Sequence, residues 1–297
     1  MKDANSTDKP RTSPARTLGP IPDLERHLPT EWWKSLFKAM YLKTDGDVVE
    51  NEQNTVDDIN LMIELSGIKP EMAMLDLCCG QGRHCLELAS RGYTNVTGVD
   101  RSRYLVRLAR RRNQRKGTNV TFKEGDARKV RLQQGSFDCV TLFGNSFGYF
   151  ERAEDDLAVL RNVFRLLKPG GMVLLDITNG ESLKTTYEPR SWEWVDQTHF
   201  VCRERAIASD GRRLISREIV THAEKGVIAD QFYAERLYTF PQIKELLEKA
   251  GFTNVARHDG PNTASTRNQD LGMMATRMFI VAWSPKDTGS KRRTAPV

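Results

Sequence analysis

The stretch LDLCCGQGRH, from Leu75 to His84, decides the fold expected of this chain. It joins an apolar run over 72–77 to two glycines one residue apart, and a helical segment follows. Glycine has no side chain to hold a ligand away, so a strand that ends in such a turn lets a ligand approach the backbone. The free N–H groups at the start of the next helix suit a carboxylate or a phosphate. We therefore predict a ligand site at Gly80 and Gly82.

Apolar strands alternate with helical segments along the first part of the chain. The predicted strands cover 72–77, 96–100, 120–126, 137–143 and 172–177. The predicted helices cover 31–43, 55–67, 81–91, 102–116 and 153–168; Thr55 with Asp58 predicts a capping box for the second, and Pro169-Gly170-Gly171 ends the last. Such alternation with β-branched strands is typical of a parallel sheet that is covered on both faces.

The alternation stops near residue 190. Turns at 209–211 and 225–226 separate three alternating runs, which predicts a three-stranded antiparallel meander. A helix over 241–250 and strands near 253–258 and 277–283 close the chain. We expect a disordered basic tail over 1–28, N-terminal helices forming a cap over 29–70, a ligand-binding domain over 71–180 and 240–284, an antiparallel insert over 181–239, and a second disordered tail over 285–297.

The net charge of +6 belongs mostly to the predicted tails. Residues 1–20 and 285–297 carry five of these six charges, so the rest of the chain is near neutral. One basic cluster is internal, on the predicted helix 102–116, and its cations gather toward the helix C-terminus, where they suit the helix dipole. We interpret it as a solvated helix face, with a nucleic-acid surface as the alternative.

The chain has five cysteines without a CxxC pair or the spacing of a disulfide framework. We therefore expect reduced, buried thiols and no metal site. No apolar run is long enough for a membrane span, and the first residues lack the apolar segment of a secretion signal, so we expect a cytoplasmic protein without a membrane partner.

Two acidic residues stand at the ends of the next predicted strands. Asp100 follows Gly82 by 18 residues, where a carboxylate can accept hydrogen bonds from ribose hydroxyls. The third strand ends in Gly125-Asp126-Ala127, whose acid can meet an adenine amino group. Three successive strand ends with matching chemistry predict a nucleoside-containing ligand.

These residues resemble the class I S-adenosylmethionine-dependent methyltransferases over 55–180 and 240–284. Asp76 with Gly80-x-Gly82 matches the family's first motif, and LLKPGG at 166–171 matches a later one. A nicotinamide dehydrogenase would carry a third glycine where this chain has Cys85. The resemblance implies an α/β Rossmann-like fold: a seven-stranded, mostly parallel sheet, with its last strand antiparallel and an inserted antiparallel β-meander lid.

The resemblance also implies the ligand and its contacts. S-adenosylmethionine is expected as the cofactor at the carboxyl ends of the strands. The residues expected to bind it are Asp76, Gly80, Gly82, Arg83, Asp100, Arg101, Asp126, Ala127, Phe143 and Gly144. Arg83, at a helix N-terminus, is expected to pair with the methionine carboxylate, although a surface arginine is an equally good interpretation.

The segment GNSFGYF at 144–150 follows the fourth predicted strand. In the family this place touches the methionine end of the cofactor and the acceptor. Sugar-modifying N-methyltransferases have a histidine where this chain has Tyr149, so an imidazole base is missing here. We predict catalytic roles for Tyr149, which can orient the acceptor or face a sulfonium, and for Asn145, which can meet an amine. A core tyrosine and a turn asparagine are the alternatives.

The predicted lid and cap carry the residues expected to contact the acceptor. These are Trp33, Tyr41, Trp192, Trp194, Tyr233 and Arg267. About half of the lid aromatics are expected to pack against the main sheet instead, and Arg267 lies in a connection that should rim the same pocket.

The sequence leaves three functions open. The first is methyl transfer to a small-molecule amine or acid in secondary metabolism, by a monomer or homodimer that binds no nucleic acid. The second is cyclisation of S-adenosylmethionine itself to azetidine-2-carboxylate with release of methylthioadenosine, since a sulfonium has three electrophilic carbons. The third is a nucleic-acid-binding methyltransferase that uses the basic helix over 102–116.

Overall fold

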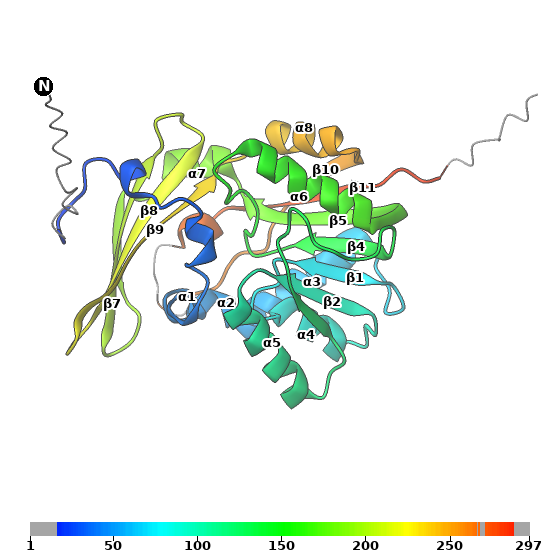
Figure 1. The fold of residues 1–297 in the computed structure, drawn as a ribbon, viewed down its shortest axis with the longest axis horizontal. Coiled ribbons are helices and arrows are strands. Elements are labelled where there is room, and N and C mark those ends of the chain that lie inside the picture. Colours follow the sequence, from blue (N-terminus) through cyan, green and yellow to red (C-terminus); the bar gives the residue numbers. More distant parts are fainter. Residues whose placement is uncertain (1–16, 266, 268–270, 288–297) are drawn as a thin grey trace, which may run out of the picture.

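The computed structural model describes residues 17–265, 267 and 271–287 and places them in two sheets (Figure 1). The seven-stranded sheet has the order β10 (Thr253–Asp259), β11 (Arg277–Trp283), β5 (Leu167–Thr178), β4 (Phe137–Leu142), β1 (Met74–Leu77), β2 (Val96–Asp100), β3 (Thr121–Glu124). The second sheet has the order β6 (Arg190–Trp194), β7 (His199–Ile207), β8 (Arg213–His222), β9 (Gly226–Arg236). The helices are α1 (Ala39–Thr44), α2 (Gly46–Val49), α3 (Glu52–Ser66), α4 (Arg83–Ser90), α5 (Arg103–Lys116), α6 (Ala153–Leu166), α7 (Gly180–Thr186) and α8 (Phe240–Ala250), with 3₁₀ turns η1 (Glu25–His27), η2 (Trp32–Lys34) and η3 (Gly272–Met274).

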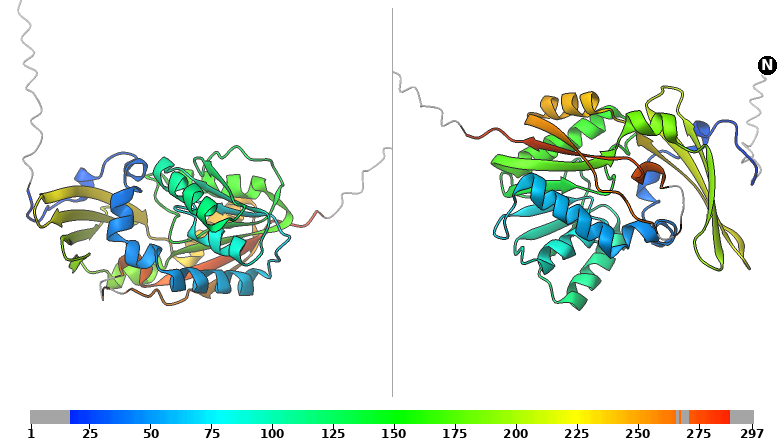
Figure 2. Two further views of the ribbon diagram at one scale, coloured as in Figure 1. Left: turned by 90° about the horizontal axis from the view of Figure 1, so that it is seen from below. Right: turned by 180° about the vertical axis from the view of Figure 1, so that it is seen from behind.

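The seven-stranded sheet confirms the predicted Rossmann-like fold. β1 to β5 are parallel, whereas β11 runs antiparallel to both β5 and β10. β1 lies near the centre, and all four of its residues are buried. One apolar core joins the sheet to α6 and α8, and another joins its opposite face to α3, α4 and α5 (Figures 1 and 2). α6 ends at Leu166 and β5 begins at Leu167, so Pro169, Gly170 and Gly171, which were expected to end the helix, belong to the strand.

The second sheet has four strands where the sequence predicted three. The run expected as one strand folds back on itself between β6 and β7. The backbone N–H groups of Thr198 and His199 donate to Asp196 Oδ1, at 2.8 and 2.9 Å. An aspartate can close a turn in this way without a glycine, which explains why the glycine pattern missed it.

The N-terminal segment, residues 17–51, differs most from the prediction. The helix expected over 31–43 is broken into η2 and α1, and Glu31 before η2 has a left-handed backbone (φ 55°). α3 starts earlier than predicted, because the side chain of Asn51 caps it by accepting the N–H of Asn54 at 3.2 Å. Thr55 therefore lies inside the helix and donates back to Asn51 O.

Residues 17–28 are not a disordered tail. The buried guanidinium of Arg217 on β8 donates to the backbone carbonyls of Thr17 and Gly19. Leu24 is 5% exposed and packs with Ile215 and Ala234 of the second sheet. The N-terminal segment continues across the molecule, and α1 and α2 lie between the two sheets (Figure 2).

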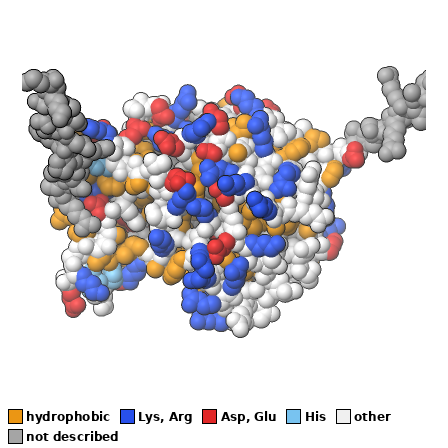
Figure 3. Space-filling view, viewed as in Figure 1, with side chains coloured by type: hydrophobic (Ala, Val, Ile, Leu, Met, Phe, Trp, Pro, Cys, Tyr) orange, Lys and Arg blue, Asp and Glu red, His pale blue; other side chains and the backbone are white. Residues whose placement is uncertain are grey.

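The basic cluster on α5 is exposed to solvent in this structure, as both of its interpretations require. Six of its cationic side chains are exposed: Arg103, Arg107, Arg110, Arg111, Arg115 and Lys116. Lys and Arg side chains gather over this helix on the face seen in Figure 3. Among the described residues, no helix has the length and apolar character needed to cross a bilayer.

Candidate functional site

A cavity of about 230 Å³ lies where the carboxyl ends of β1, β2 and β4 face the second sheet. Three parts of the chain form its walls. The loops after the parallel strands contribute Gly80, Arg83, Asp100, Arg101, Asp126, Ala127, Phe143 and Gly144; the N-terminal segment contributes Trp32, Trp33, Phe37, Tyr41 and Asp45; the second sheet contributes Arg203, Arg205, Glu218, Tyr233 and Glu235. The predicted ligand site thus lies in a partly open cavity between the two sheets.

The two glycines of the opening turn are needed for different reasons. Gly82 has φ 80°, and a Cβ there would lie 2.7 Å from the ring of Phe122, so helix α4 can approach β3 only with glycine. Gly80 has φ 55°, and the nearest atom to a Cβ would be 4.0 Å away. Gly80 therefore keeps a left-handed conformation and leaves its backbone open to the cavity.

Asp100 stands on the cavity wall beside that turn. Its two carboxylate oxygens accept the backbone N–H groups of Gly80 at 2.9 Å and Ser102 at 2.6 Å. Burial raises the pKa of Asp100 to about 6, although these hydrogen bonds oppose the shift. A carboxylate oxygen keeps a further lone pair after one such bond, so Asp100 can still accept hydroxyl groups from a ligand.

Asp126 and Ala127 form the next part of the wall. Burial disfavours the charged form of Asp126, but hydrogen bonds from Arg128 outweigh it and hold its pKa below the ordinary value. The guanidinium of Arg128 lies 5.2 Å from the centre of the Trp33 ring, and that of Arg101 lies 4.8 Å from it. Trp33, which the sequence analysis expected to contact the acceptor, therefore forms part of the cavity wall, and its ring makes cation–π contacts with both arginines.

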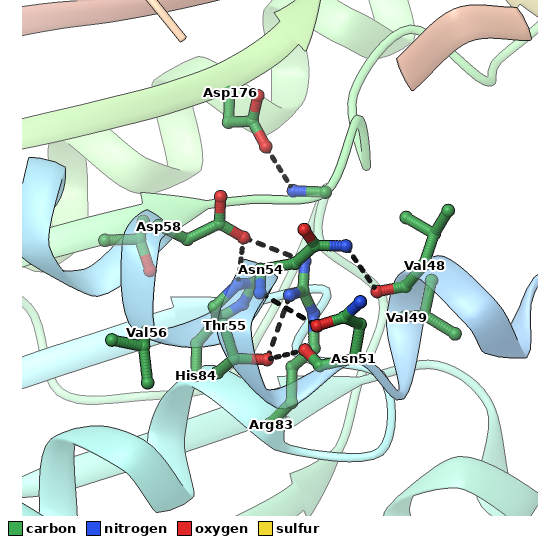
Figure 4. A network of polar contacts seen from close by, with 12 residues as sticks. Val48, Val49, Asn51, Asn54, Thr55, Val56, Asp58, Arg83, His84 and Asp176 are labelled. Carbon is green, nitrogen blue, oxygen red and sulfur yellow. Dashed lines mark hydrogen bonds and ion pairs between the residues drawn. The ribbon is translucent and has the colours of Figure 1, made fainter. Parts of the chain in front are cut away.

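A buried network of charges holds Arg83 at the opposite wall (Figure 4). Asp58 on α3 is fully buried, and its Oδ2 accepts Arg83 Nη2 at 3.0 Å and His84 Nε2 at 2.9 Å. Burial opposes ionisation of Asp58, but the hydrogen bond from His84 and the charges of Arg83 and Arg277 outweigh it and lower its pKa. The ion pair with Asp58 thus fixes the orientation of the Arg83 side chain in the cavity wall.

The same network reaches the loop after β4. Arg277 Nη2 donates to the second oxygen of Asp58 at 2.8 Å, while its Nε donates to Asp176 Oδ1 at 2.9 Å. Asp176, labelled in Figure 4, in turn accepts the backbone N–H of Gly144 at 2.7 Å. Two arginines and two aspartates therefore balance one another and fix two walls of the cavity.

Asn145 does not line the cavity. It is 3% exposed, its Oδ1 accepts the backbone N–H of Thr178, and its Nδ2 donates to Glu235 Oε2 at 2.8 Å. The amide therefore supports Glu235, which does line the cavity. Desolvation raises the pKa of Glu235 to about 7, although the bond from Asn145 lowers it.

Tyr149 belongs to a cluster of rings in the cavity. It makes an edge contact with Trp32 at 5.4 Å and stacks on Phe37 at 5.6 Å between ring centres. Tyr41 makes an edge contact with Phe37, and Tyr233 makes a tilted contact with Trp32. Burial raises the pKa of Tyr149, so its hydroxyl stays protonated.

Several predicted contact residues lie elsewhere. Trp192 and Trp194 are 62% and 65% exposed on the outer strand β6, where they pack against each other and Phe200. Arg267 donates to the backbone carbonyls of Lys43 and Thr44, so its guanidinium holds the N-terminal segment.

Asp76 lies beneath the glycine turn, outside the cavity. Its two oxygens accept Thr141 Oγ1 at 3.2 Å and Cys85 Sγ at 3.4 Å. Burial raises its pKa. Its contacts join β1 to β4 and α4, so it supports the floor of the site.

The sequence prediction missed Asp45, Asp58 and Glu235. Glu235 carried a usable signal, because residues two apart on a strand face the same side and Tyr233 was already expected to face the acceptor. Asp45 and Asp58 carried none, since their roles depend on how the N-terminal segment folds over the sheet. In the part of the chain that the structure describes, no group of three or more His, Cys, Asp or Glu side chains could hold a metal ion.

Comparisons with known proteins agree with this geometry. A family model described as a methyltransferase domain matches residues 74–171, which contain the glycine turn, Asp100 and Asp126. The putative methyltransferase YqeM of Bacillus subtilis (strain 168) is 25% identical over 181 residues, covering 60% of this chain and 72% of that protein.

Solved structures share the fold at low identity. An S-adenosylmethionine-dependent methyltransferase from Clostridium acetobutylicum ATCC 824 has a TM-score of 0.66 at 18% identity, over 83% of this chain and 96% of that chain. The S-adenosylmethionine-bound amino pentose methyltransferase CalS10 from Micromonospora echinaspora has a TM-score of 0.56 at 20% identity, over 84% of this chain and 98% of that chain. Residues 74–171 therefore match a methyltransferase domain, and the chain as a whole shares the fold of S-adenosylmethionine-dependent methyltransferases.

Proposed function

We propose that the protein methylates a nitrogen of a small-molecule amine bound between the two sheets. The observation that carries this proposal is Glu235, a carboxylate that is 3% exposed and reaches the cavity from β9. An amine attacks only when it is neutral, so a nearby proton acceptor favours reaction. With its pKa raised to about 7, Glu235 suits that role near neutral pH.

The cavity walls fit S-adenosylmethionine, the cofactor of this proposal, at three points. Gly80 leaves its backbone open, Asp100 can accept the two ribose hydroxyls, and Arg83 can meet the methionine carboxylate. Asp126 and Ala127 would hold the adenine end beneath Trp33. When bound, S-adenosylmethionine supplies an electrophilic methyl carbon next to a thioether leaving group that needs no proton.

The residues of this chain would then do three things. Glu235 accepts the proton that the amine loses, and Asn145 keeps the carboxylate pointed at the cavity. Tyr149 offers a protonated hydroxyl and an aromatic face to the acceptor nitrogen. In this proposal the second sheet and the N-terminal segment act as lid and cap, and they exclude water from the aligned reactants.

The neighbours make amino sugars the first acceptors to test, since CalS10 is an amino pentose methyltransferase. The full chain is incubated with S-adenosylmethionine and a panel of amino sugars and simple primary amines, and S-adenosylhomocysteine is measured. We expect turnover with at least one amine, and loss of most of it in Glu235→Gln.

The matched control is Glu224→Gln, an exposed glutamate in the β8–β9 turn that also loses one negative charge. It should keep full activity. Turnover that survives in Glu235→Gln at neutral pH would contradict the proposed base. A panel in which none of the amines is methylated would contradict the acceptor class.

A further inference from the structure

We infer that Asp45 anchors a second, positively charged nitrogen of the acceptor, so the acceptor is a dibasic small molecule. This inference rests on the proposed function and adds a second recognition point to the same cavity. Asp45 joins α1 to α2 in the N-terminal segment, while Glu235 comes from β9 of the second sheet. The two carboxylates therefore reach the cavity from separate elements.

The other acids of the cavity wall already have strong partners. Glu218 accepts Arg203 Nε at 2.8 Å and Gln231 Nε2 at 2.9 Å, one on each oxygen. Asp126 pairs with Arg128, and Asp100 accepts two backbone N–H groups. These three carboxylates do not need a cation from a ligand.

Asp45 and Glu235 are different. Among the described residues, Asp45 accepts one hydrogen bond, from the hydroxyl of Thr44 at 2.7 Å, and has no cation within ion-pair distance. Glu235 accepts one bond, from the amide of Asn145, and no described cation lies within ion-pair distance of it, although the charge of Arg205 acts on it from farther away. Glu235 is buried and Asp45 is half-buried in the cavity wall. A carboxylate shielded from water without a cation is costly, and an ammonium group entering the cavity would lower that cost.

The surroundings of Asp45 point toward the acceptor side of the cavity. Its pKa is raised to about 6, first by burial and then by the charge of Glu218, and the charges of Arg203 and Glu193 also act on it. Glu218, Arg203 and Glu193 all belong to the second sheet. The charges that act most strongly on Asp45 thus come from the second sheet, the wall that faces the loops after the parallel strands across the cavity.

Aromatic rings connect the two carboxylates. The negative charges of Glu235 and Asp45 both help to raise the pKa of Tyr149. The charge of Asp45 also acts on the pKa of Tyr41 and Tyr233 in the same direction. Ring faces attract cations, and carboxylates beside them strengthen that attraction. The cavity thus offers two cation positions around one group of tyrosines.

The two positions have different consequences for the chemistry. A nitrogen at Glu235 can lose its proton and react. Asp45 is the weaker base of the two carboxylates, with its pKa raised to about 6 against about 7 for Glu235, so the nitrogen at Asp45 keeps its proton and cannot attack. One amine of the acceptor is then methylated while the other only holds the molecule in place.

The test measures binding to the full chain saturated with S-adenosylhomocysteine. The probes are 1,3-diaminopropane, 1,4-diaminobutane and 1,5-diaminopentane, with 1-aminobutane as the monoamine, studied by titration calorimetry. We expect the best diamine to bind about tenfold or more tighter than the monoamine, as a charge-assisted bond in a buried site requires. Asp45→Asn should abolish that preference, and Glu52→Gln, an exposed acid in the first turn of α3, should preserve it.

Two results would overturn the inference. One is a diamine preference that is absent in the wild type or persists in Asp45→Asn. The other is that Asp45→Asn weakens binding of S-adenosylhomocysteine but not of methylthioadenosine, which lacks the amino group; Asp45 would then serve the cofactor. Failure of either kind leaves monoamine methylation by Glu235 standing, so it is distinct from failure of the proposed function.

Discussion

Replacing Asp58 by asparagine tests whether the buried network orients Arg83 toward the methionine end of the cofactor. The substitution keeps the shape of the side chain but removes the negative charge that Arg83, His84 and Arg277 share. Arg83 then keeps only its 3.1 Å bond to Thr55 Oγ1 among the described contacts. The guanidinium loses the contact that fixes its direction.

The magnitudes follow from burial and contact count. Breaking a fully buried ion pair by removing one partner costs about 3–5 kcal/mol. Asparagine still offers one acceptor and Asp176 still pairs with Arg277, so we expect a loss of about 3 kcal/mol in the free energy of unfolding. A misdirected Arg83 should weaken the binding of S-adenosylhomocysteine by about 1.5–3 kcal/mol, because a hydrogen bond to a charged group contributes that much. This loss corresponds to a Kd about tenfold or more higher.

Calorimetry with two ligands separates orientation from general damage. S-adenosylhomocysteine carries the amino-acid part and methylthioadenosine does not, so only the first should bind more weakly to Asp58→Asn. Asp57→Asn is the matched control, because Asp57 lies next along α3 and bonds only to Gln53 among the described contacts. Equal weakening of both ligands would mean that Asp58 is merely structural, and no weakening of either would refute the reasoning.

Three further predictions concern single residues. Burial raises the pKa of Glu235 to about 7, so between pH 4.5 and about 7 the Glu235 carboxyl is protonated in the folded state and ionised in the unfolded chain. Its contribution to the free energy of unfolding is therefore complete below pH 4.5 and is lost as the pH rises through 7. Wild type should lose about 3 kcal/mol relative to Glu235→Gln between pH 4 and 8 in urea unfolding, and parallel pH curves would contradict this. Asp100→Ala should weaken S-adenosylmethionine about 100-fold by calorimetry, because two charge-assisted bonds disappear; an unchanged Kd would contradict its role. Gly82→Ala should destabilise the fold by about 1–3 kcal/mol more than Gly92→Ala, since both have positive φ but only Gly82 meets the Phe122 ring; equal thermal shifts would contradict the steric argument.

The sequence predicted the parallel core well because its signals are local. Each of β1, β2 and β4 is an apolar run bounded by turn residues, and the chemistry of the site follows where those runs end. Asp100 is such a case, since a strand that ends in aspartate places a carboxylate at the sheet edge whatever the rest of the chain does. Its contact with Gly80 across 20 residues follows from the parallel order of β1 and β2.

Tertiary contacts decided what the sequence could not predict. Asn145 looked like a site residue, yet its left-handed backbone (φ 53°) turns the amide toward Glu235. Trp192 looked like a pocket residue, but the Asp196 turn makes β6 an outer strand and leaves the ring in solvent. Neither the packing of the N-terminal segment nor the partners of Asp58 can be read from periodicity, because they join residues far apart in the chain.

Mass spectrometry of the full chain incubated with S-adenosylmethionine, first alone and then with small amines, tests the central claim most directly. The proposal predicts intact S-adenosylmethionine without an acceptor, and S-adenosylhomocysteine together with a methylated amine when the right acceptor is added. Stoichiometric methylthioadenosine with a cyclic amino acid in the absence of any acceptor would contradict it, because the cofactor itself would then be the substrate.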